Sequence, residues 1–452
     1  MPVIEIGAKN FIAGESTSDL VSDRGFSPKS NGLNLTKTRG MFYFRESGSE
    51  VGSSTLTGNI VASTFDPRAS GNDSLHVDDE ANFYTYSGTT LTKRQTGANT
   101  YQLGTSELIN FKSQIYATSQ TAVAQLNDQM SSMTENWWSG LTAGYRHPME
   151  AIEDELFIAD KNVIYYWNGS SSGIAFTLPD SRIAVTSLRK APDGRTLLAF
   201  TSDNEQNFSH TLGGGGKVYY CNPVLRDWER EVQLEAQVEG SRVVGGTIFV
   251  TYGSNFGYYD GNGLQPLYRF ETSTTTYSHN ISNIEDILIF RDGKKVVAYG
   301  DLGAGNTFWK LYGSATNNIN NIHYKGDNKL LVAFSDGAGG GDLYEIDYDN
   351  AGIIGDFYSN RYTFGGEVII RRIKIFHDET NSAGTSRFTL GYNDINGSLS
   401  DIKDVQYTNQ STYKTVIDCD IQTDMFQLYI APQNDDLGYK LIQIFYEPVE
   451  QA

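Results

Sequence analysis

The chain has 452 residues, too many for one small core, so we expect two or three domains or one long repeat array with an appended domain. Its 46 glycines, 28 tyrosines and 23 phenylalanines are typical of many short strands joined by tight turns, whereas the long Ala/Leu/Glu/Lys stretches of a helical protein are missing. The formal net charge of −19 argues against binding nucleic acid through a broad basic face, because an acidic surface repels phosphates.

The first 60 residues do not join the repeat that follows them. Residues 32–44 predict one or two strands, which would form either an arm that wraps a neighbour or a strand that closes a ring. The N-terminus lacks a basic region followed by an apolar core, so we expect no secretory signal, although a leader absent from this sequence would leave export open. No apolar run reaches the roughly 18 residues of a membrane helix, so we expect no membrane span and synthesis in a cytoplasm.

From about residue 82 to about residue 354 a hairpin recurs, each copy pairing two apolar or aromatic runs across a Gly, Asn or Asp turn. The copies lie at residues 82–93, 113–126, 155–169, 195–206, 246–263, 286–301 and 329–347. The marker residues are Phe83, Ile115, Leu156, Leu198, Ile248, Ile287 and Leu331, and the gaps between them are 32, 41, 42, 50, 39 and 44 residues. A period near 40–50 residues with four strands per unit is typical of propeller blades, so we predict a β-propeller of about six or seven blades. The alternative is another multi-sheet β fold with regular hairpins.

Local patterns favour blades stacked between neighbours. Asp292 and Gly293 stand between two apolar runs, which is a strong hairpin signal. Residues 163–167 are apolar on both faces of a strand, as expected of a sheet that is covered on both sides. Residues 131–150 are expected to form a loop between blades, and residues 149–154 could form a short helix before the next strand.

After about residue 354 the pattern changes to longer alternating strands. Ile373 and Ile375 are expected to point to one face, and Arg372 and Lys374 to the other. Several such strands over about 90 residues predict an antiparallel β-sandwich. We therefore divide the chain into an N-terminal arm with first strands (1–60), a β-propeller (61–354) and a C-terminal β-sandwich (355–452).

No candidate site has a specific signature, so we predict no catalytic residue, no cofactor-binding residue, no metal ligand and no cofactor. The loop with His76, Asp78, Asp79 and Glu80 could hold a cation, but such a cluster is more often a charged surface tip. Residues 347–352 resemble the start of a calcium loop but lack an oxygen ligand at its fifth position.

Other motifs are also better explained by structure than by chemistry. Residues 335–337 and 191–195 resemble the Asp-box turns of sialidase-type propellers without their closing aromatic residue. Glycine runs at 213–216 and 339–341 lack the Lys-Ser/Thr pair of a phosphate loop. Trp137-Trp138 and the aromatics of 256–259 could stack on sugars but are more often core.

The chain has two cysteines, Cys221 and Cys419, far apart in sequence. We expect two structural thiols in a reducing compartment, with a disulfide between them left open.

A polar N-terminal segment ending in residues 34–41 (NLTKTRGM), a degenerate propeller and a C-terminal sandwich opening with residues 371–376 (RRIKIF) resemble virion structural proteins of tailed bacteriophages. The nearest types are the propeller-containing stopper or tail-nozzle proteins of short-tailed phages. The resemblance covers most of the chain in architecture and transfers no site residues. It implies a non-enzymatic, ring-forming homo-oligomer, expected to be hexameric, that is assembled in the host cytoplasm into the virion tail or connector. Its partners would be the portal, adaptor or tail fibres, and genome DNA would be retained or conducted along its axis without sequence-specific binding.

Two other functions stay open. A glycan-binding or glycan-cleaving propeller used in host recognition would need Arg, Asp and Trp side chains converging on the propeller axis. A propeller scaffold for protein partners would show a hydrophobic rim on one blade face.

Overall fold

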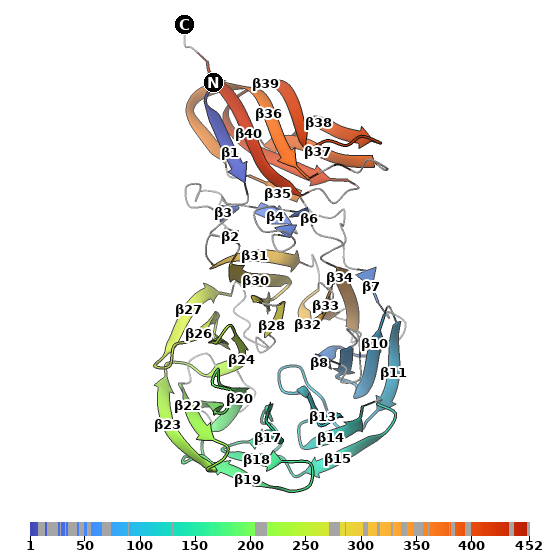
Figure 1. Ribbon diagram of the computed structural model, residues 1–452, viewed down its shortest axis with the longest axis vertical. Coiled ribbons are helices and arrows are strands. Elements are labelled where there is room, and N and C mark those ends of the chain that lie inside the picture. The colour runs from blue at the N-terminus through green and yellow to red at the C-terminus, as the bar shows by residue number, and fades with distance from the viewer. Residues whose placement is uncertain are drawn as a thin grey trace. The chain divides into compact units, whose positions relative to one another are not determined.

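Figure 1 shows the computed structural model, which describes residues 1–452 except 8–13, 16–25, 28, 32, 35–42, 45–48, 52–55, 66–73, 89, 129, 204–214, 271–280, 285, 302–305, 314–316, 327–328, 336–340, 348–355, 360, 379, 381–384, 394–398, 434–437 and 450–452. Among the described residues every regular element is a β-strand. The predicted all-β fold is therefore confirmed. The chain forms two compact units, one of residues 49–294 and 314–345, the other of residues 1–48, 295–313 and 346–452.

Seven four-stranded antiparallel sheets follow one another along the chain (Figure 1). Blades one to four are β8 (Ile60–Phe65), β9 (Ser74–Asp78), β10 (Asn82–Ser87) and β11 (Thr90–Thr96); β12 (Leu108–Phe111), β13 (Gln114–Thr118), β14 (Ala122–Asn127) and β15 (Met133–Ser139); β16 (Met149–Ile152), β17 (Glu155–Asp160), β18 (Val163–Trp167) and β19 (Ser172–Thr177); and β20 (Ala184–Lys190), β21 (Leu197–Ser202), β22 (Gly216–Asn222) and β23 (Asp227–Leu234). Blades five to seven are β24 (Val238–Val244), β25 (Thr247–Tyr252), β26 (Asn255–Tyr259) and β27 (Leu264–Arg269); β28 (Ile281–Ile284), β29 (Ile287–Asp292), β30 (Lys295–Asp301) and β31 (Asn306–Gly313); and β32 (Ile319–Gly326), β33 (Lys329–Ser335), β34 (Gly341–Asp347) and β7 (Ser49–Glu50).

The first strand of each of these sheets lies innermost. The inner strands β8, β12, β16, β20, β24, β28 and β32 each contact the next in this order, and β32 contacts β8, which closes the ring. The predicted propeller is therefore confirmed, with seven blades.

The seventh blade is completed by a strand from near the N-terminus. β7 pairs with β34, with Glu50 opposite Tyr344, and Val51 N donates a hydrogen bond to Leu343 O at 2.8 Å. This ring-closing strand lies just after the stretch 32–44 for which a closing strand was considered; within that stretch the structure shows the short strands Leu33–Asn34 and Tyr43–Phe44, which pair with each other. Because the chain continues from β7 in the sheet of blade seven to β8 in blade one, this pairing closes the ring.

Three local predictions need correction. Residues 133–139 form β15, the outer strand of blade two, rather than part of a loop. Residues 149–152 form the inner strand β16 rather than a helix, because pairing with β17 overrides the helical preference of Met, Glu and Ala. The marker Phe83 lies on the third strand of its blade, whereas the later markers lie on second strands. Leu75 on β9 is the better marker, and the first gap becomes 115 − 75 = 40 residues.

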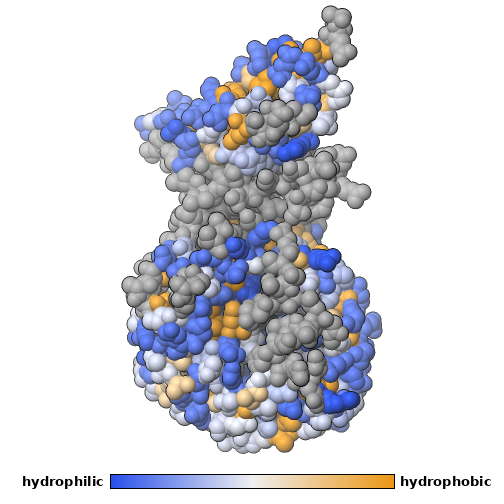
Figure 2. Space-filling view, turned by 180° about the vertical axis from the view of Figure 1, so that it is seen from behind, coloured by the Kyte–Doolittle hydropathy of each residue, from blue (hydrophilic) through white to orange (hydrophobic). Residues whose placement is uncertain are grey.

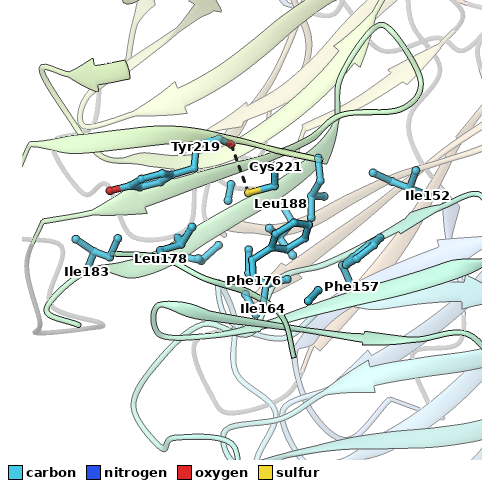
Figure 3. Packing of buried hydrophobic residues seen from close by; sticks show 14 residues of the cluster. Ile152, Phe157, Ile164, Phe176, Leu178, Ile183, Leu188, Tyr219 and Cys221 are labelled. Carbon is cyan, nitrogen blue, oxygen red and sulfur yellow. Dashed lines mark hydrogen bonds between the residues drawn. The ribbon is translucent and has the colours of Figure 1, made fainter. Parts of the chain in front are cut away.

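Apolar residues on both faces of the blades form the cores between neighbouring blades. Figure 3 shows one such core, where Phe157 and Ile164 of blade three meet Leu188 and Tyr219 of blade four. Both faces of a blade are covered by neighbouring blades here, which explains why residues 163–167 are apolar at successive positions.

The second unit is built on long antiparallel strands. Its hydrogen-bonded order is β1 (Val3–Gly7), β40 (Tyr439–Pro448), β36 (Tyr362–His377), β39 (Lys414–Pro432), β35 (Asp356–Tyr358) and β4 (Lys29–Asn31), with β37 (Thr385–Asn393) and β38 (Leu399–Thr408) attached beside β39. The short strands β2 (Gly14–Glu15) and β3 (Phe26–Ser27) pair with each other, as do β5 (Leu33–Asn34) and β6 (Tyr43–Phe44).

The arrangement of this unit is consistent with the predicted sandwich. β39 pairs with β36 along its first part and with β37 along its last part, so it runs from one group of strands to the other. The rings of Phe388 on β37 and Tyr439 on β40 meet edge to face at 5.9 Å, and both side chains are buried. Buried Ile373 and Ile375 lie on the inner face, as the alternation predicted.

Candidate functional site

Polar side chains of the inner strands hydrogen-bond from blade to blade. Arg189 of β20 donates from Nη1 to Glu150 Oε2 on β16 at 3.0 Å, and from Nε to Ser241 Oγ on β24 at 3.2 Å. Arg242 of β24 donates from Nε to Asn283 Oδ1 on β28 at 3.0 Å. We call these five residues, which come from four consecutive blades, the axial cluster.

The axial cluster is partly open to solvent and carries an excess of positive charge. The side chain of Arg189 is 25% exposed and that of Glu150 is 15% exposed. Burial, together with the charge of nearby Arg189, lowers the pKa of Arg242, whose contact with Asn283 supplies no negative charge. The five residues of the cluster thus include two guanidinium groups and one carboxylate, which contacts Arg189.

The histidines beside the cluster are neutral. His76 on β9 bonds Ser63 Oγ through Nδ1 at 2.7 Å and Ser74 Oγ through Nε2 at 2.8 Å, and burial followed by the charge of its neighbours lowers its pKa well below the usual value. Burial and the nearby Arg242 lower the pKa of His323 to about 3. Neither ring can thus supply a charge at neutral pH.

A buried ion pair links two blades that are not neighbours. Arg146, just before blade three, donates from Nη1 to Glu239 O at 2.7 Å and lies 3.3 Å from Glu239 Oε2 on blade five. Burial raises the pKa of Glu107, near Arg189, and its Oε2 accepts a hydrogen bond from Met149 N at 2.9 Å. These contacts hold the inner strands in place.

The pattern required of a glycan-binding axis is incomplete. The seven inner strands contribute Arg189 and Arg242, but their sequences contain neither Asp nor Trp. Trp137 and Trp138 lie on the outer strand β15, where Trp137 packs against the rings of Tyr116 and Trp167. The two tryptophans are thus part of the packing between blades.

A cleft of about 750 Å³ is lined by residues of blades three and four. One wall is acidic and comes from the β16–β17 turn (Glu153–Glu155), and the other comes from the loop before β21 and from the β22–β23 turn (residues 222–226). Arg226 also lines the cleft. It forms an ion pair with Glu155, and its guanidinium carbon lies 4.2 Å from the ring centroid of Tyr166.

The β22–β23 turn holds two apolar side chains in solvent at this cleft. Val224 is 84% exposed and Leu225 is 67% exposed. The turn is nevertheless well fixed, because Asn222 Oδ1 accepts hydrogen bonds from Val224 N at 3.0 Å and Leu225 N at 3.1 Å. Arg226 continues the turn with a φ of +58°. We call Val224 and Leu225 the projecting pair.

Two of the residues considered as cation ligands, Asp78 and Asp79, have structural roles. Asp78 Oδ1 accepts from Asn82 N at 2.7 Å and its Oδ2 from Tyr84 Oη at 2.8 Å, while Asp79 Oδ1 accepts from Asn59 N at 2.8 Å. No group of three or more possible metal ligands occurs within the described part of the chain.

Several other sequence candidates are settled or lie outside the described residues. Asp193 caps its own turn, accepting from Arg195 N at 2.8 Å and Thr196 N at 2.9 Å. Cys221 and Cys419 are free thiols. Residues 348–352, 336–340 and 213–214 of the remaining candidates lie outside the described part of the chain.

Sequence reasoning missed the axial cluster because its residues are ordinary surface types one by one. The signal was their spacing: from Glu150 to Arg189, Arg242 and Asn283 the steps are 39, 53 and 41 residues, close to the blade period. A comparison of polar residues about one blade period apart would have identified Glu150, Arg189, Arg242 and Asn283 as one group.

Comparisons with known proteins add no family. No family model matches the chain, and no curated protein matches it. Among solved structures, the crystal structure of the computationally designed Ika8 protein is similar, with a TM-score of 0.42 and 10% identity over 66% of this chain and 98% of that one. Among the described residues, no helix is long and apolar enough to cross a membrane.

Proposed function

We propose that this chain is a structural assembly component and not an enzyme. In this proposal it is a subunit of a homo-oligomeric, hexameric ring in the tail or connector of a tailed-phage virion, of the stopper or nozzle type. The ring would dock on other virion proteins and retain or conduct genome DNA. A propeller whose blade cores and ring closure are fully built from its own strands is compatible with a scaffold that carries other proteins.

The projecting pair is the observation that carries this proposal. Figure 2 shows one face on which hydrophobic residues form small patches among hydrophilic ones. Single exposed apolar residues are normal, but Val224 and Leu225 are adjacent, strongly exposed and held by a hydrogen-bonded turn at the edge of a cleft. Because the backbone of this turn is already held by hydrogen bonds, binding a partner there costs less conformational entropy than ordering a flexible loop.

A second copy of the chain is the occupant that we assign to this surface. Rings form through heterologous contacts, in which a patch on one subunit meets a different patch on the next. A projecting pair beside a cleft suits one half of such a contact. DNA would then follow the axis of the ring of subunits, because the propeller's own inner strands are bridged by Arg146 and Glu239. The net charge of −19 would keep DNA from adhering.

Replacing both members of the projecting pair by serine tests the proposal. We expect the wild-type chain to form rings visible by negative-stain imaging and light scattering, and V224S/L225S to remain monomeric. Because both side chains are exposed, the variant should keep the wild-type melting temperature. Ile174→Ser, which removes a side chain that is 59% exposed on the outer strand β19, is the matched control and should assemble normally.

A strictly monomeric wild-type chain that stays monomeric with its neighbouring virion proteins would overturn the proposal. Binding or cleavage of oligosaccharides by that monomer would favour the host-recognition alternative instead.

A further inference from the structure

We propose that the axial cluster binds a small oxyanion, with its oxygens bridging the guanidinium groups of Arg189 and Arg242. The ligand class is a carboxylate, sulfate or phosphate small enough to enter among the inner strands. This inference does not depend on the proposed role in assembly.

Several N–H donors of Arg189 and Arg242 are not used in hydrogen bonds among the described residues. A guanidinium has five N–H donors, and among the described residues Arg242 uses only Nε, in its bond to Asn283. Arg189 uses Nε and Nη1 in its bonds to Ser241 and Glu150. The Nη groups of Arg242 and Nη2 of Arg189 remain for a ligand. The fork of a guanidinium matches paired oxygens of a carboxylate, sulfate or phosphate.

The side chains of the axial cluster have an excess of positive charge. Arg189 and Arg242 carry two positive charges and Glu150 carries one negative charge, although the whole chain has a net charge of −19. The neighbouring Arg146 is already paired with Glu239, and the buried Glu107 accepts a hydrogen bond from Met149 N at 2.9 Å. A partly buried positive charge without its own carboxylate is stabilised by an anion from solution.

An anion from solution can reach the axial cluster. Arg189 and Glu150 are each partly exposed, so solvent reaches the cluster. The cluster joins four blades around the propeller axis, where propellers have a central channel.

Glu150 acts in this scheme as an internal competitor. Its carboxylate already occupies Nη1 of Arg189 at 3.0 Å. Removing its charge frees this donor for the ligand and raises the net positive charge of the cluster. A structural salt bridge alone predicts the opposite, namely that Glu150→Gln only loosens the site.

Isothermal titration of the full chain with sodium sulfate, sodium phosphate and sodium citrate tests the inference. We expect saturable binding of at least one anion with one site per chain, weakened by about tenfold or more in Arg242→Gln. Glu150→Gln should bind more tightly than wild type. Arg242→Lys keeps the charge but not the fork, and should bind with intermediate affinity.

Arg269→Gln, which alters an exposed arginine on the outer strand β27, is the control and should bind like wild type. Circular dichroism and melting temperature show whether each variant is folded. Absence of saturable binding for all three anions overturns the inference, and so does equal affinity of wild type and a folded Arg242→Gln. Weaker binding in a folded Glu150→Gln also overturns it. Tighter binding of sulfate and phosphate than of citrate would assign a tetrahedral anion, and the reverse would assign a carboxylate.

Discussion

Glu345 is a buried carboxylate at the point where the last blade meets the first. Its Oε2 accepts hydrogen bonds from Tyr86 Oη of blade one at 2.7 Å and from Lys325 Nζ at 3.1 Å, and its Oε1 accepts from Lys329 Nζ at 3.0 Å. Burial alone would raise the pKa of Glu345, but these donors outweigh it and the pKa lies below the usual value. The ionised form is thus more stable in the folded chain than in the unfolded one.

We expect Glu345→Gln to lower the free energy of unfolding at pH 7 by about 3 kcal/mol, because it leaves Lys325 buried beside a neutral group. A carboxyl whose pKa is depressed by folding stabilises above its unfolded pKa of about 4.3, and this contribution is lost as pH falls through the folded pKa. The difference between variant and wild type should therefore shrink near pH 3. Urea denaturation at both pH values measures it, with exposed Glu80→Gln as the control. A difference independent of pH would contradict the assigned ionisation.

We predict that the two cysteine thiols react slowly in the folded protein. Burial, followed by the charge of Asp227, raises the pKa of Cys221 to about 12, and burial, followed by Asp420 and Asp418, raises that of Cys419 to about 11. Because the thiolate is the reactive form, Ellman's reagent at pH 8 should react slowly with the native chain. Two thiols should react rapidly after denaturation in guanidinium chloride. A fast native reaction of one thiol would place that cysteine in a more open site.

At the scale of elements, the sequence predicted the middle strands of the blades far better than the inner and outer ones. Second and third strands such as β17 and β18 are six and five residues long, are mostly apolar and are joined by a tight turn. Inner strands such as β12, β16 and β28 have four residues each, too few for a clear period, and their register is imposed by neighbouring strands. Because the candidate site lies on these inner strands, it was missed together with them.

The ring-closing strand β7 could not be predicted from the sequence, because it is only two residues long and is defined by its pairing with β34. Nothing in Ser49 and Glu50 distinguishes a strand from a loop. Their pairing with β34 connects positions almost 300 residues apart, a contact that local propensity does not encode.

We expect Val51→Asp to destabilise the propeller by about 3 kcal/mol, because it places a charge in the cluster of Leu343, Tyr86 and Leu331 and weakens the closure of blade seven. Thermal unfolding and limited proteolysis would detect the loosened closure. Val3→Asp, at a position that is 40% exposed on β1, is the matched control and should change stability little. Equal effects of the two substitutions would show that β7 does not secure the ring.

At the scale of the whole molecule, composition and repeat period were sufficient for the fold class because they reflect hundreds of contacts at once. Function depends on few residues, and here those residues carry no motif. Glu150, Arg189 and Arg242 acquire meaning only when the blades bring them to one axis. The projecting pair likewise looks like two core residues until the turn that exposes them is known.

The net charge leads to a prediction about assembly. Subunits that each carry −19 repel one another, and this repulsion is screened as the Debye length falls from about 30 Å at 0.01 M salt to about 8 Å at 0.15 M. Since the proposed contact is apolar, we expect the fraction of rings measured by light scattering to rise with sodium chloride over this range. V224S/L225S should stay monomeric at every salt concentration, because screening removes repulsion but supplies no apolar contact. Dissociation of rings by added salt would mean that ion pairs, and not the projecting pair, hold the subunits together.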